Sequence, residues 1–584
     1  MSSMLNISDP CCDYTLFEHI INRILILLIL VFAVVYIFLI FRTNINWDEF
    51  SFLSRIYNYQ NGRPVGTLQS FYVHLFGWLT NIKGWEIEQI ISARFIQLII
   101  LFSCMGLLYA ISRRFFSVTE ALLTVFLVLS YTDIIRHGFS FRYDPICLFF
   151  FLLSLYLMLK GKIISAVFAG LFLSLSFLTS IKTILYLPTI VALFVISIHS
   201  SKNRKQTIKI YLIFAFCSIC WLSILYLWHS YMLSNTVLKL RLPQNLMKVE
   251  ASISAAGSKV LWTGKFFPRS TFIFRSFLEN SGTWFVIISG FFLSIIHLFS
   301  SQDRKRYSMV LSFILPLSSL LFYRNAFSYF FVFIIPPALI ISGVYFELSK
   351  YYKKQGHTNF AIILVLAPVI IATVNSAKLI NYRLKDHIQS QRELITLIHK
   401  IFPEPVPYID RNGMIASFPS VGFFMSTWGI EDYRKKNIPI MRSILEKQQP
   451  KFLIADTPIL RIDDERWFGQ DKSIYRLLDK DYNILKKNFI PQWGALYLPG
   501  KSFNQLSKGK MQMFEILIEG EYTVEADKDI NIDGKHVVPG EVVLLTKGQH
   551  RIESEEDQSV VLRWGVNLYR PNKSPSKRII YVGL

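Results

Sequence analysis

The sequence has few charged residues for its length. Asp, Glu, Lys and Arg make up only 17% of its 584 residues, whereas 52% are hydrophobic and the mean hydropathy is +0.38. Because water-soluble proteins carry about 25% charged residues, an ordinary soluble fold is excluded. We expect an α-helical protein that crosses a membrane several times.

Cysteine is also scarce, and none lies in the polar C-terminal third of the chain. The six residues are Cys11, Cys12, Cys104, Cys147, Cys217 and Cys220. They provide no disulfide framework and no zinc-ligand spacing in that third. Cys217 and Cys220 form a C-x-x-C motif inside an apolar run, which is typical of small residues that pack helices together.

Long apolar runs, by contrast, are abundant. About eleven runs of roughly 17 to 23 residues are long enough to cross the hydrocarbon core as helices. The predicted spans are 21–41, 95–112, 117–132, 145–160, 163–180, 184–199, 209–230, 283–300, 308–323, 327–347 and 359–377. The first run lacks a small-residue cleavage site, so we expect a retained anchor and not a signal peptide.

The net charge is +22, and its placement predicts the orientation of the chain. The basic loops contain Arg113 and Arg114, Lys160 and Lys162, and the segments 202–209, 304–306 and 353–354. Such loops stay in the cytoplasm, and their position at helix ends argues against nucleic-acid binding. We expect a bacterial inner membrane protein with a cytoplasmic N-terminus (1–20) and a periplasmic or extracellular region after about residue 378.

Two of the predicted outer loops are too long to be simple connectors. Loops 42–94 and 231–282 have aromatic and apolar residues at helical spacing, which predicts amphipathic helices along the membrane interface. Loop 42–94 begins with the segment NINWDEF. Its Asp48 and Glu49 either cap such a helix or belong to the working end of an enzyme. The basic residues of loop 231–282 indicate contacts with anionic lipids.

Four outer loops place charged residues at the same membrane face. They supply Asp48 and Glu49, Arg142 and Asp144 in RYDP, Lys182 in TSIK, and Arg324 in YRNA. A cation between two apolar runs costs a few kcal/mol unless it is paired or reaches the interface. The convergence of these charges from distant parts of the sequence predicts one shared site.

These motifs resemble those of the GT-C superfamily of polytopic glycosyltransferases, which includes aminoarabinose transferases and protein O-mannosyltransferases. The resemblance rests on the acidic pair, Arg94 in SARF, RYDP, Lys182 in LSFLTSIKTILYLP, and FYRNAFSYFFVFIIPP, all in the family's order. It implies a GT-C-like transmembrane catalytic domain over residues 21–380.

The resemblance also implies a reaction. Family members transfer a sugar from a polyprenyl-phosphate donor to a glycan, lipid or protein acceptor outside the cytoplasm, usually with inversion. Asp48 matches the family's catalytic acid position, with Glu49 as its neighbour or substitute, and would act as the base. The leaving phosphate needs cations, for which Arg142, Lys182 and Arg324 are the candidates.

Further residues are candidates for substrate contacts. Asp144 is expected to orient Arg142 or the acceptor, and Arg94 belongs to a family motif. His74 and His137 could touch substrate, although a lone histidine has no partner spacing to support that role.

No cofactor is expected. A paired carboxylate could bind a divalent metal, as in the oligosaccharyltransferase branch of the superfamily. The sequence has no His/Asp cluster at metal-ligand spacing, so the prediction is a metal-independent enzyme.

A transporter or flippase of a lipid-linked saccharide is the alternative. Transporters usually show an internal repeat and broken spans that hold polar residues at mid-membrane. This sequence has no clear repeat, and its distinctive charges lie at one face.

The composition changes after residue 380. Helical and strand patterns alternate over 381–505, which predicts an α/β region outside the cytoplasm. Short strands separated by turns such as IDGK and VPGE predict an antiparallel β-sandwich over 506–584. The sandwich resembles a carbohydrate-binding module, and a packing or lid domain is the alternative.

Overall fold

The computed structural model describes most of the chain as two compact units. The described residues are 16–63, 65–67, 69–234, 266–301, 303–385, 388–423, 425–457, 459–462, 476–575 and 580–581. Unit 1 comprises Met1–Thr43, Asn58–Leu79 and Ile91–Lys385, and unit 2 comprises Asn44–Tyr57, Thr80–Ile90 and Asp386–Leu584. The predictions for residues 1–15 and for most of loop 231–282 lie outside the described residues.

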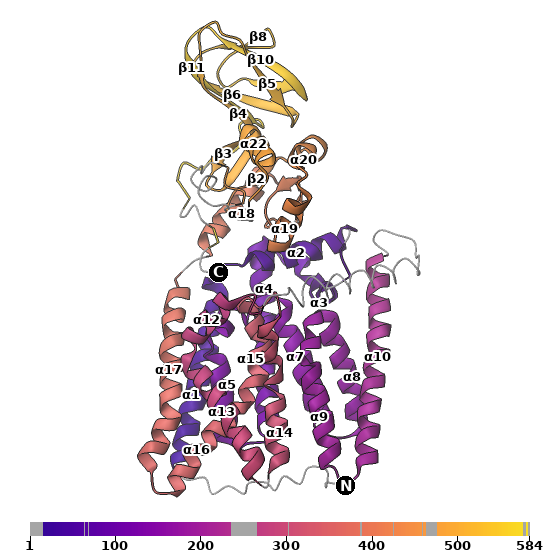
Figure 1. Ribbon diagram of the computed structural model, residues 1–584. Helices are drawn as coiled ribbons and strands as arrows, with labels where there is room; N and C mark the ends of the chain where they lie inside the picture. The colour runs from indigo at the N-terminus through magenta and orange to yellow at the C-terminus, as the bar shows by residue number, and fades with distance from the viewer. Residues whose placement is uncertain are drawn as a thin grey trace. The chain divides into compact units, whose positions relative to one another are not determined.

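Helices make up unit 1 (Figure 1). They are α1 (Leu16–Arg42), α3 (Tyr72–Phe76), η1 (Gly77–Asn81), α4 (Glu86–Ser112), α5 (Val118–Leu129), α6 (Thr132–His137), α7 (Tyr143–Met158), α8 (Ile163–Thr179), η2 (Ile181–Tyr186), α9 (Leu187–Ser200), α10 (Arg204–Ser234), α12 (Ser270–Glu279), α13 (Ser281–Ser300), α14 (Arg304–Ser312), η4 (Leu315–Leu321), η5 (Ser328–Phe330), α15 (Phe331–Ala338), η6 (Leu339–Ile341), α16 (Ser342–Lys354) and α17 (Thr358–Arg383). The first residues of α4 and the end of η1 belong to unit 2.

Seven segments of the described residues are long and apolar enough to cross a membrane. They are Glu18–Arg42, Glu86–Ser112, Ile181–Ser200, Arg204–Leu233, Ser281–Ser300, Ser328–Lys354 and Thr358–Arg383, with shorter apolar helices at Val118–Leu129, Tyr143–Met158 and Ile163–Thr179. Together they cover every predicted run except 308–323. The prediction of an α-helical polytopic membrane protein is confirmed.

The exception has a local cause. The predicted run 308–323 consists of α14 followed by η4, because Pro316 lies at the start of η4. Proline has no backbone N–H and clashes with the carbonyl four residues earlier, which disfavours one continuous α-helix there. Pro188 has the same position at the start of α9, where η2 precedes it.

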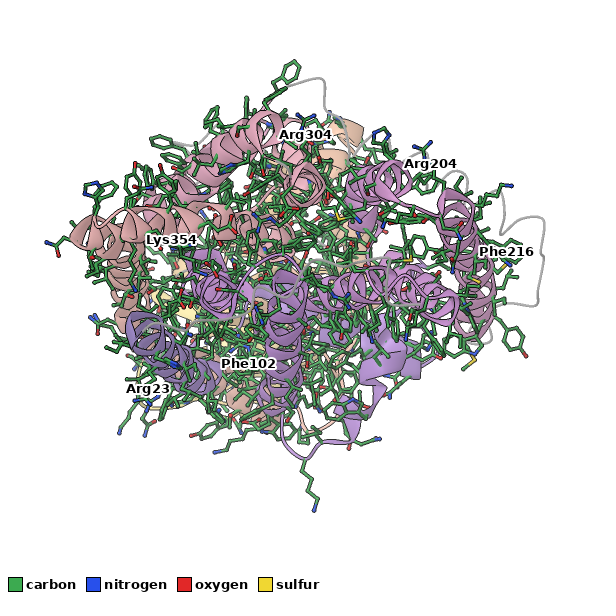
Figure 2. All side chains as sticks on the ribbon, turned by 90° about the horizontal axis from the view of Figure 1, so that it is seen from below. Arg23, Phe102, Arg204, Phe216, Arg304 and Lys354 are labelled. Atoms are coloured by element: carbon green, nitrogen blue, oxygen red, sulfur yellow. The ribbon has the colours of Figure 1, made fainter. Side chains whose placement is uncertain are left out.

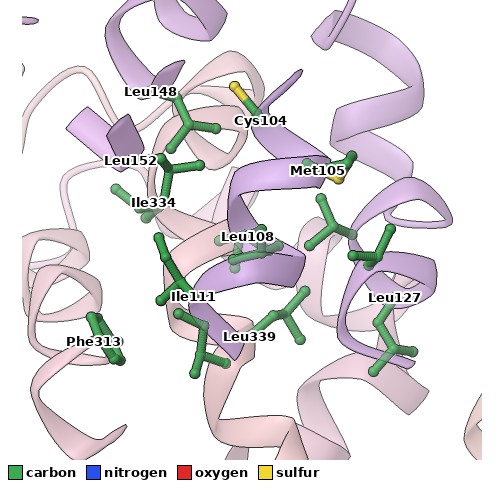
Figure 3. Close-up of a cluster of buried hydrophobic side chains, with 14 of the residues drawn as sticks. Cys104, Met105, Leu108, Ile111, Leu127, Leu148, Leu152, Phe313, Ile334 and Leu339 are labelled. Carbon is green, nitrogen blue, oxygen red and sulfur yellow. The ribbon is translucent and has the colours of Figure 1, made fainter. Parts of the chain in front are cut away.

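The core of unit 1 lies where α4, α5, α7 and α15 pack together. Figure 3 shows Cys104 and Leu108 of α4 among aliphatic side chains that include Leu148 of α7 and Ile334 of α15. On the other side of α7, α8 packs between α7 and α10. A Cβ atom at Gly170 of α8 would lie 3.0 Å from Cys217 Cβ, so Cys217 packs at a close helix contact.

Basic residues gather at one end of these helices. Figure 2, seen from below, shows Arg23 of α1, Arg204 at the start of α10, Arg304 at the start of α14 and Lys354 at the end of α16. Three of these four belong to the loops for which a cytoplasmic location is predicted.

Unit 2 combines helices and strands. Its elements are α2 (Trp47–Gln60), α18 (Gln389–Ile401), β1 (Tyr408–Ile409), α19 (Thr427–Lys436), α20 (Met441–Gln448), β2 (Phe452–Ile454), α22 (Asp479–Asn488), β3 (Phe489–Trp493), β4 (Leu496–Leu506), β5 (Gln512–Ile516), β6 (Gly520–Ala526), β7 (Ile530–Ile532), β8 (Lys535–Val537), β9 (Val542–Leu545), β10 (Gly548–Ser554) and β11 (Gln558–Trp564). The last residues of α2 belong to unit 1.

Two sheets organise these strands. A seven-stranded sheet has the order β1-β2-β4-β11-β6-β9, with β3 also paired to β4, and a four-stranded sheet has the order β5-β10-β7-β8. Only β1 and β2 are parallel among these pairs. Strand β4 pairs with β2 and β3 through its first residues and with β11 through the rest. Residues of both sheets share one apolar core, as in a β-sandwich.

Candidate functional site

A buried cluster of charge in unit 1 lies around Asp144. Its Oδ1 accepts a hydrogen bond from Lys182 Nζ at 2.6 Å, and its Oδ2 accepts one from Arg142 Nε at 3.2 Å. All three side chains are at most 3% exposed. One carboxylate therefore holds two cations, which leaves one positive charge in excess within the three residues.

Two helix starts position the members of this cluster. Asp144 lies in the first turn of α7, where a carboxylate interacts favourably with the helix dipole, and Pro145 follows at a position that needs no backbone donor. Lys182 lies in η2, whose N-cap residue Ser180 accepts a hydrogen bond from the Lys182 backbone N–H at 3.4 Å. The sequences RYDP and TSIK thus each begin a helix and present a charge at that point.

Aromatic rings cover the cations of the cluster. The guanidinium carbon of Arg142 lies 3.8 Å from the ring centre of Tyr329, and Lys182 Nζ lies 4.9 Å from the same centre. Lys182 Nζ also lies 4.8 Å from the ring centre of Tyr143. Cation–π contacts at desolvated sites contribute about 2 kcal/mol, so these rings stabilise the buried positive charge.

A second set of charges belongs to α6 and α12. Arg136 donates two hydrogen bonds to Glu279, at 2.5 and 2.9 Å, and one to Asp133 Oδ1 at 3.3 Å. Burial raises the pKa of Asp133 to about 6, although Arg136 and Arg275 partly offset this effect. The bidentate arrangement fixes α12 against α6.

His137 lies between the two sets of charged residues, because it follows Arg136 in α6 and contacts Tyr329. Its ring contacts the Tyr329 ring edge to face, with 6.3 Å between the ring centres. Burial lowers the pKa of His137 well below its ordinary value, and the nearby guanidinium of Arg142 lowers it further. The imidazole is therefore neutral at neutral pH and adds no charge to the cluster.

Two other predicted site residues have contacts outside this cluster. Arg94 is buried and donates to the backbone carbonyls of Ile40, at 3.1 Å, and Thr43, at 2.9 Å. A cation at these carbonyls stabilises the C-terminal end of α1. Arg324 is half-buried between η4 and η5, where its carbonyl accepts a hydrogen bond from Arg269 Nε at 3.0 Å.

His74 forms a pair with another histidine. Its Nε2 lies 2.8 Å from His229 Nδ1, and His229 Nε2 lies 3.1 Å from both Ser70 Oγ and the Thr67 carbonyl. Because that carbonyl can only accept, His229 Nε2 is the donor to it and His229 Nδ1 accepts from His74. Burial lowers the pKa of His74. The contacts of His74 therefore join α3 to α10.

Asp48 and Glu49 belong to unit 2, where they begin α2. The Asp48 N–H donates to Asn46 Oδ1 at 2.9 Å, and the Asn46 N–H donates to Glu49 Oε1 at 3.0 Å. The Glu49 contact is that of a capping box, while the Asn46 side chain caps Asp48, one position earlier than in that motif. Glu49 is fully buried, whereas Asp48 is half-buried. The two carboxylates that stand side by side in the sequence therefore have different surroundings.

Several residues of these clusters have no distinctive signal in the sequence. Tyr329 lies in the family motif FYRNAFSYFFVF, but an aromatic residue there reads as part of an apolar run. His229 lies near the end of an apolar run, and no spacing links it to His74. Gln97, whose Nε2 donates to the Arg142 carbonyl at 2.9 Å, is likewise a single polar residue in an apolar helix.

A protein-family model matches part of the chain. The model of the dolichyl-phosphate-mannose-protein mannosyltransferase family matches residues 75–228. No curated protein matches the chain.

Three solved structures are similar to most of the chain. The oligosaccharyltransferase of Archaeoglobus fulgidus, tethered to an acceptor peptide with the NVT sequon, has 10% identity and a TM-score of 0.53 over 94% of this chain and 97% of its own. The same organism's oligosaccharyltransferase AglB, with an inhibitory peptide and a dolichol-phosphate, has 12% identity and a TM-score of 0.52 over 91% and 76%. ArnT from Cupriavidus metallidurans, bound to undecaprenyl phosphate, has 12% identity and a TM-score of 0.50 over 74% and 93%. The expected resemblance to the GT-C superfamily is confirmed at the level of the fold.

Proposed function

We propose that this chain, which has the GT-C glycosyltransferase fold, transfers a sugar from a polyprenyl-phosphate donor to a glycan, lipid or protein acceptor outside the cytoplasm. The observation that carries the proposal is the buried cluster in which Asp144 holds both Arg142 and Lys182. Departure of a lipid phosphate develops negative charge, and preorganised cations are the groups that stabilise it. The similar structures solved with undecaprenyl phosphate and dolichol-phosphate support a lipid-linked donor.

The reaction is a single inverting displacement. A base removes the proton of the acceptor hydroxyl or amine, and the freed oxygen or nitrogen forms a bond to the anomeric carbon. The bond between that carbon and the phosphate oxygen breaks, and its electron pair leaves with the lipid phosphate. Arg142 and Lys182 gather the charge of this phosphate, while Asp144 keeps both cations in position.

We propose Asp48 as the base, with Glu49 as the second choice. This assignment rests on the place of Asp48 in the first outer loop of the sequence. The capping contact of Glu49 with Asn46 favours Asp48, because the Glu49 carboxylate already satisfies a backbone donor.

The location of the protein and its independence of a metal are also proposals. By the positive-inside rule the basic loops support a cytoplasmic N-terminus, and the proposed location is the inner membrane of a bacterial cell with residues after 378 outside. No metal is required in this proposal, since Arg142 and Lys182 supply the positive charge. Chelation by EDTA is therefore expected to leave the rate unchanged.

One assay tests the proposal. The purified full-length protein is incubated with a panel of radiolabelled polyprenyl-phosphate sugars, and the release of lipid phosphate is measured. One donor should be consumed, and Asp48→Asn should slow its use by about 10²- to 10⁴-fold. If every donor stays intact, the proposed activity is wrong, and an unimpaired Asp48→Asn enzyme would exclude Asp48 as the base.

A further inference from the structure

A polar cavity lies in unit 1, away from Asp144. It has a volume of about 250 Å³ and is bounded by the turn between α7 and α8, the turn between α9 and α10, and α14. Asp144 lies in the first turn of α7, and Met158, which lines the cavity, is the last residue of the same helix. Roughly 21 Å of helix separates them. The cavity is therefore not part of the site described above.

Four basic residues line this cavity. They are Arg114, Lys160, Lys162 and Lys305, and within the described ranges no carboxylate forms an ion pair with any of them. Burial lowers the pKa of Lys305 below its ordinary value, as expected for a half-buried cation without an acidic partner. The cavity thus has an excess of positive charge that an anion would neutralise.

Hydroxyl groups line the same cavity. Thr207 Oγ1 donates to Ser201 Oγ at 2.9 Å, and Ser197 Oγ lies 3.2 Å from the hydroxyl oxygen of Tyr211. A hydroxyl can donate to a phosphate oxygen, and lysine and arginine side chains bind phosphate through charge-assisted hydrogen bonds. The polar lining of the cavity therefore fits a phosphate group.

An apolar slot of about 20 Å³ adjoins the cavity between α7, α9 and α10. Met158, Leu159 and Tyr211 line both the cavity and the slot. The other walls of the slot are Phe151, Ser154, Leu155, Ile190, Leu193 and Phe214. The slot has room for about one water molecule and not for a hydrocarbon chain, so the polar cavity alone is the candidate binding site.

We propose that the cavity binds the phosphate headgroup of an anionic phospholipid. The loops that line it are among those predicted to face the cytoplasm, where anionic lipids attract basic residues. This inference does not depend on the proposed glycosyl transfer, and its test needs no sugar donor.

The test compares two variants with the same change of charge. Lys160→Gln/Lys162→Gln/Lys305→Gln removes three charges from the cavity. Lys202→Gln/Arg204→Gln/Lys205→Gln is the matched control, because these side chains are exposed on the neighbouring α9–α10 loop and α10 and do not line the cavity. Each full-length protein is placed in nanodiscs of phosphatidylcholine, with and without phosphatidylglycerol, and its thermal midpoint is measured.

Phosphatidylglycerol should raise the midpoint of the parent and of the control variant, but not that of the cavity variant. A direct hydrogen bond from each cavity residue to the phosphate contributes about 1 kcal/mol, so the loss of three weakens binding on the order of 100-fold. Should the triple variant fail to fold in phosphatidylcholine alone, the exposed Lys162→Gln single variant gives the same comparison with about a fivefold effect.

Two results would overturn the proposal. An equal loss of the lipid effect in the cavity and control variants would show that general surface charge is responsible. A separate arm adds inorganic phosphate or glycerol 3-phosphate to the phosphatidylcholine nanodiscs. If either raises the midpoint as much as phosphatidylglycerol does, the cavity is a site for a soluble anion and the lipid assignment is wrong.

Discussion

Lys182 and Asp144 are 38 positions apart in the sequence, yet Lys182 Nζ donates to Asp144 Oδ1 at 2.6 Å. A second lysine–carboxylate pair of unit 1, Lys350 and Glu120, has the same separation of 2.6 Å. The two pairs differ in the exposure of the lysine: the Lys182 side chain is 3% exposed, whereas the Lys350 side chain is 33% exposed. The Lys350 pair therefore serves as a matched control for the buried cluster.

Asp144→Asn should destabilise unit 1 by roughly 3 to 5 kcal/mol, because Arg142 and Lys182 lose the carboxylate that they share. Glu120→Gln should have a smaller effect, since solvent screens the charge of Lys350. The thermal midpoint of the full-length protein in detergent measures both variants. Equal shifts in the midpoint would contradict the assignment of a buried, mutually dependent cluster.

Tyr329→Phe should retain the binding of the donor, because the ring face toward Arg142 and Lys182 is kept. Tyr329→Leu should raise the KM for the donor by roughly 2- to 30-fold, which corresponds to about 0.5 to 2 kcal/mol of lost cation–π contact. Steady-state kinetics of the two variants measure this difference. A KM for the leucine variant equal to that of the phenylalanine variant would show that the ring is a packing residue only.

Glu49→Gln should change neither the rate nor the stability, because glutamine can accept the same hydrogen bond from Asn46 in the capping box. Glu49→Ala should lower stability by about 0.5 to 2 kcal/mol through loss of that contact. Asp48→Asn should instead lower kcat with little change in the thermal midpoint. A large loss of activity in Glu49→Gln would assign the base to Glu49.

Asp456 gives unit 2 a defined dependence on pH. Burial, together with the neighbouring Asp410, raises the pKa of Asp456 to about 7. The folded state keeps the proton between about pH 4 and pH 7 while the unfolded state loses it, so stability falls as the pH rises through this range.

Asp456→Asn should remove this dependence. Its gain in stability over the parent should be near zero at pH 4 and should rise to roughly 4 kcal/mol at most at pH 7 and above. Thermal unfolding of both proteins at pH 5 and pH 8 measures the difference. A gain of the same size at both values would contradict a protonated Asp456.

Much of unit 1 could be predicted because membrane helices leave a strong signal in hydropathy. A lysine between apolar runs, as in TSIK, has to be paired or reach the interface, and this requirement predicts a shared site that includes both Lys182 and Asp144. What the pattern could not predict was the partner of each charge. Arg94 belongs to a family motif at the start of a predicted span, yet it binds the carbonyls at the end of α1.

Other differences arise from contacts between distant segments. The pairing of His74 with His229 depends on how α3 packs against α10, and no periodicity carries that information. The separate surroundings of Asp48 and Glu49 depend on which side of α2 each faces. The helical fold and the positions of charged residues can thus be predicted from single segments of the sequence. Hydrogen-bond partners cannot, because they are set by tertiary packing.

The release of lipid phosphate by Lys182→Met is the most direct test of the proposed anion site. With the donor that the parent protein consumes, this variant should be about 10²- to 10³-fold slower, as is usual when one preorganised donor to a developing anion is removed. Lys350→Met, its matched control, should retain the rate of the parent. Equal rates for Lys182→Met and the parent would contradict the account.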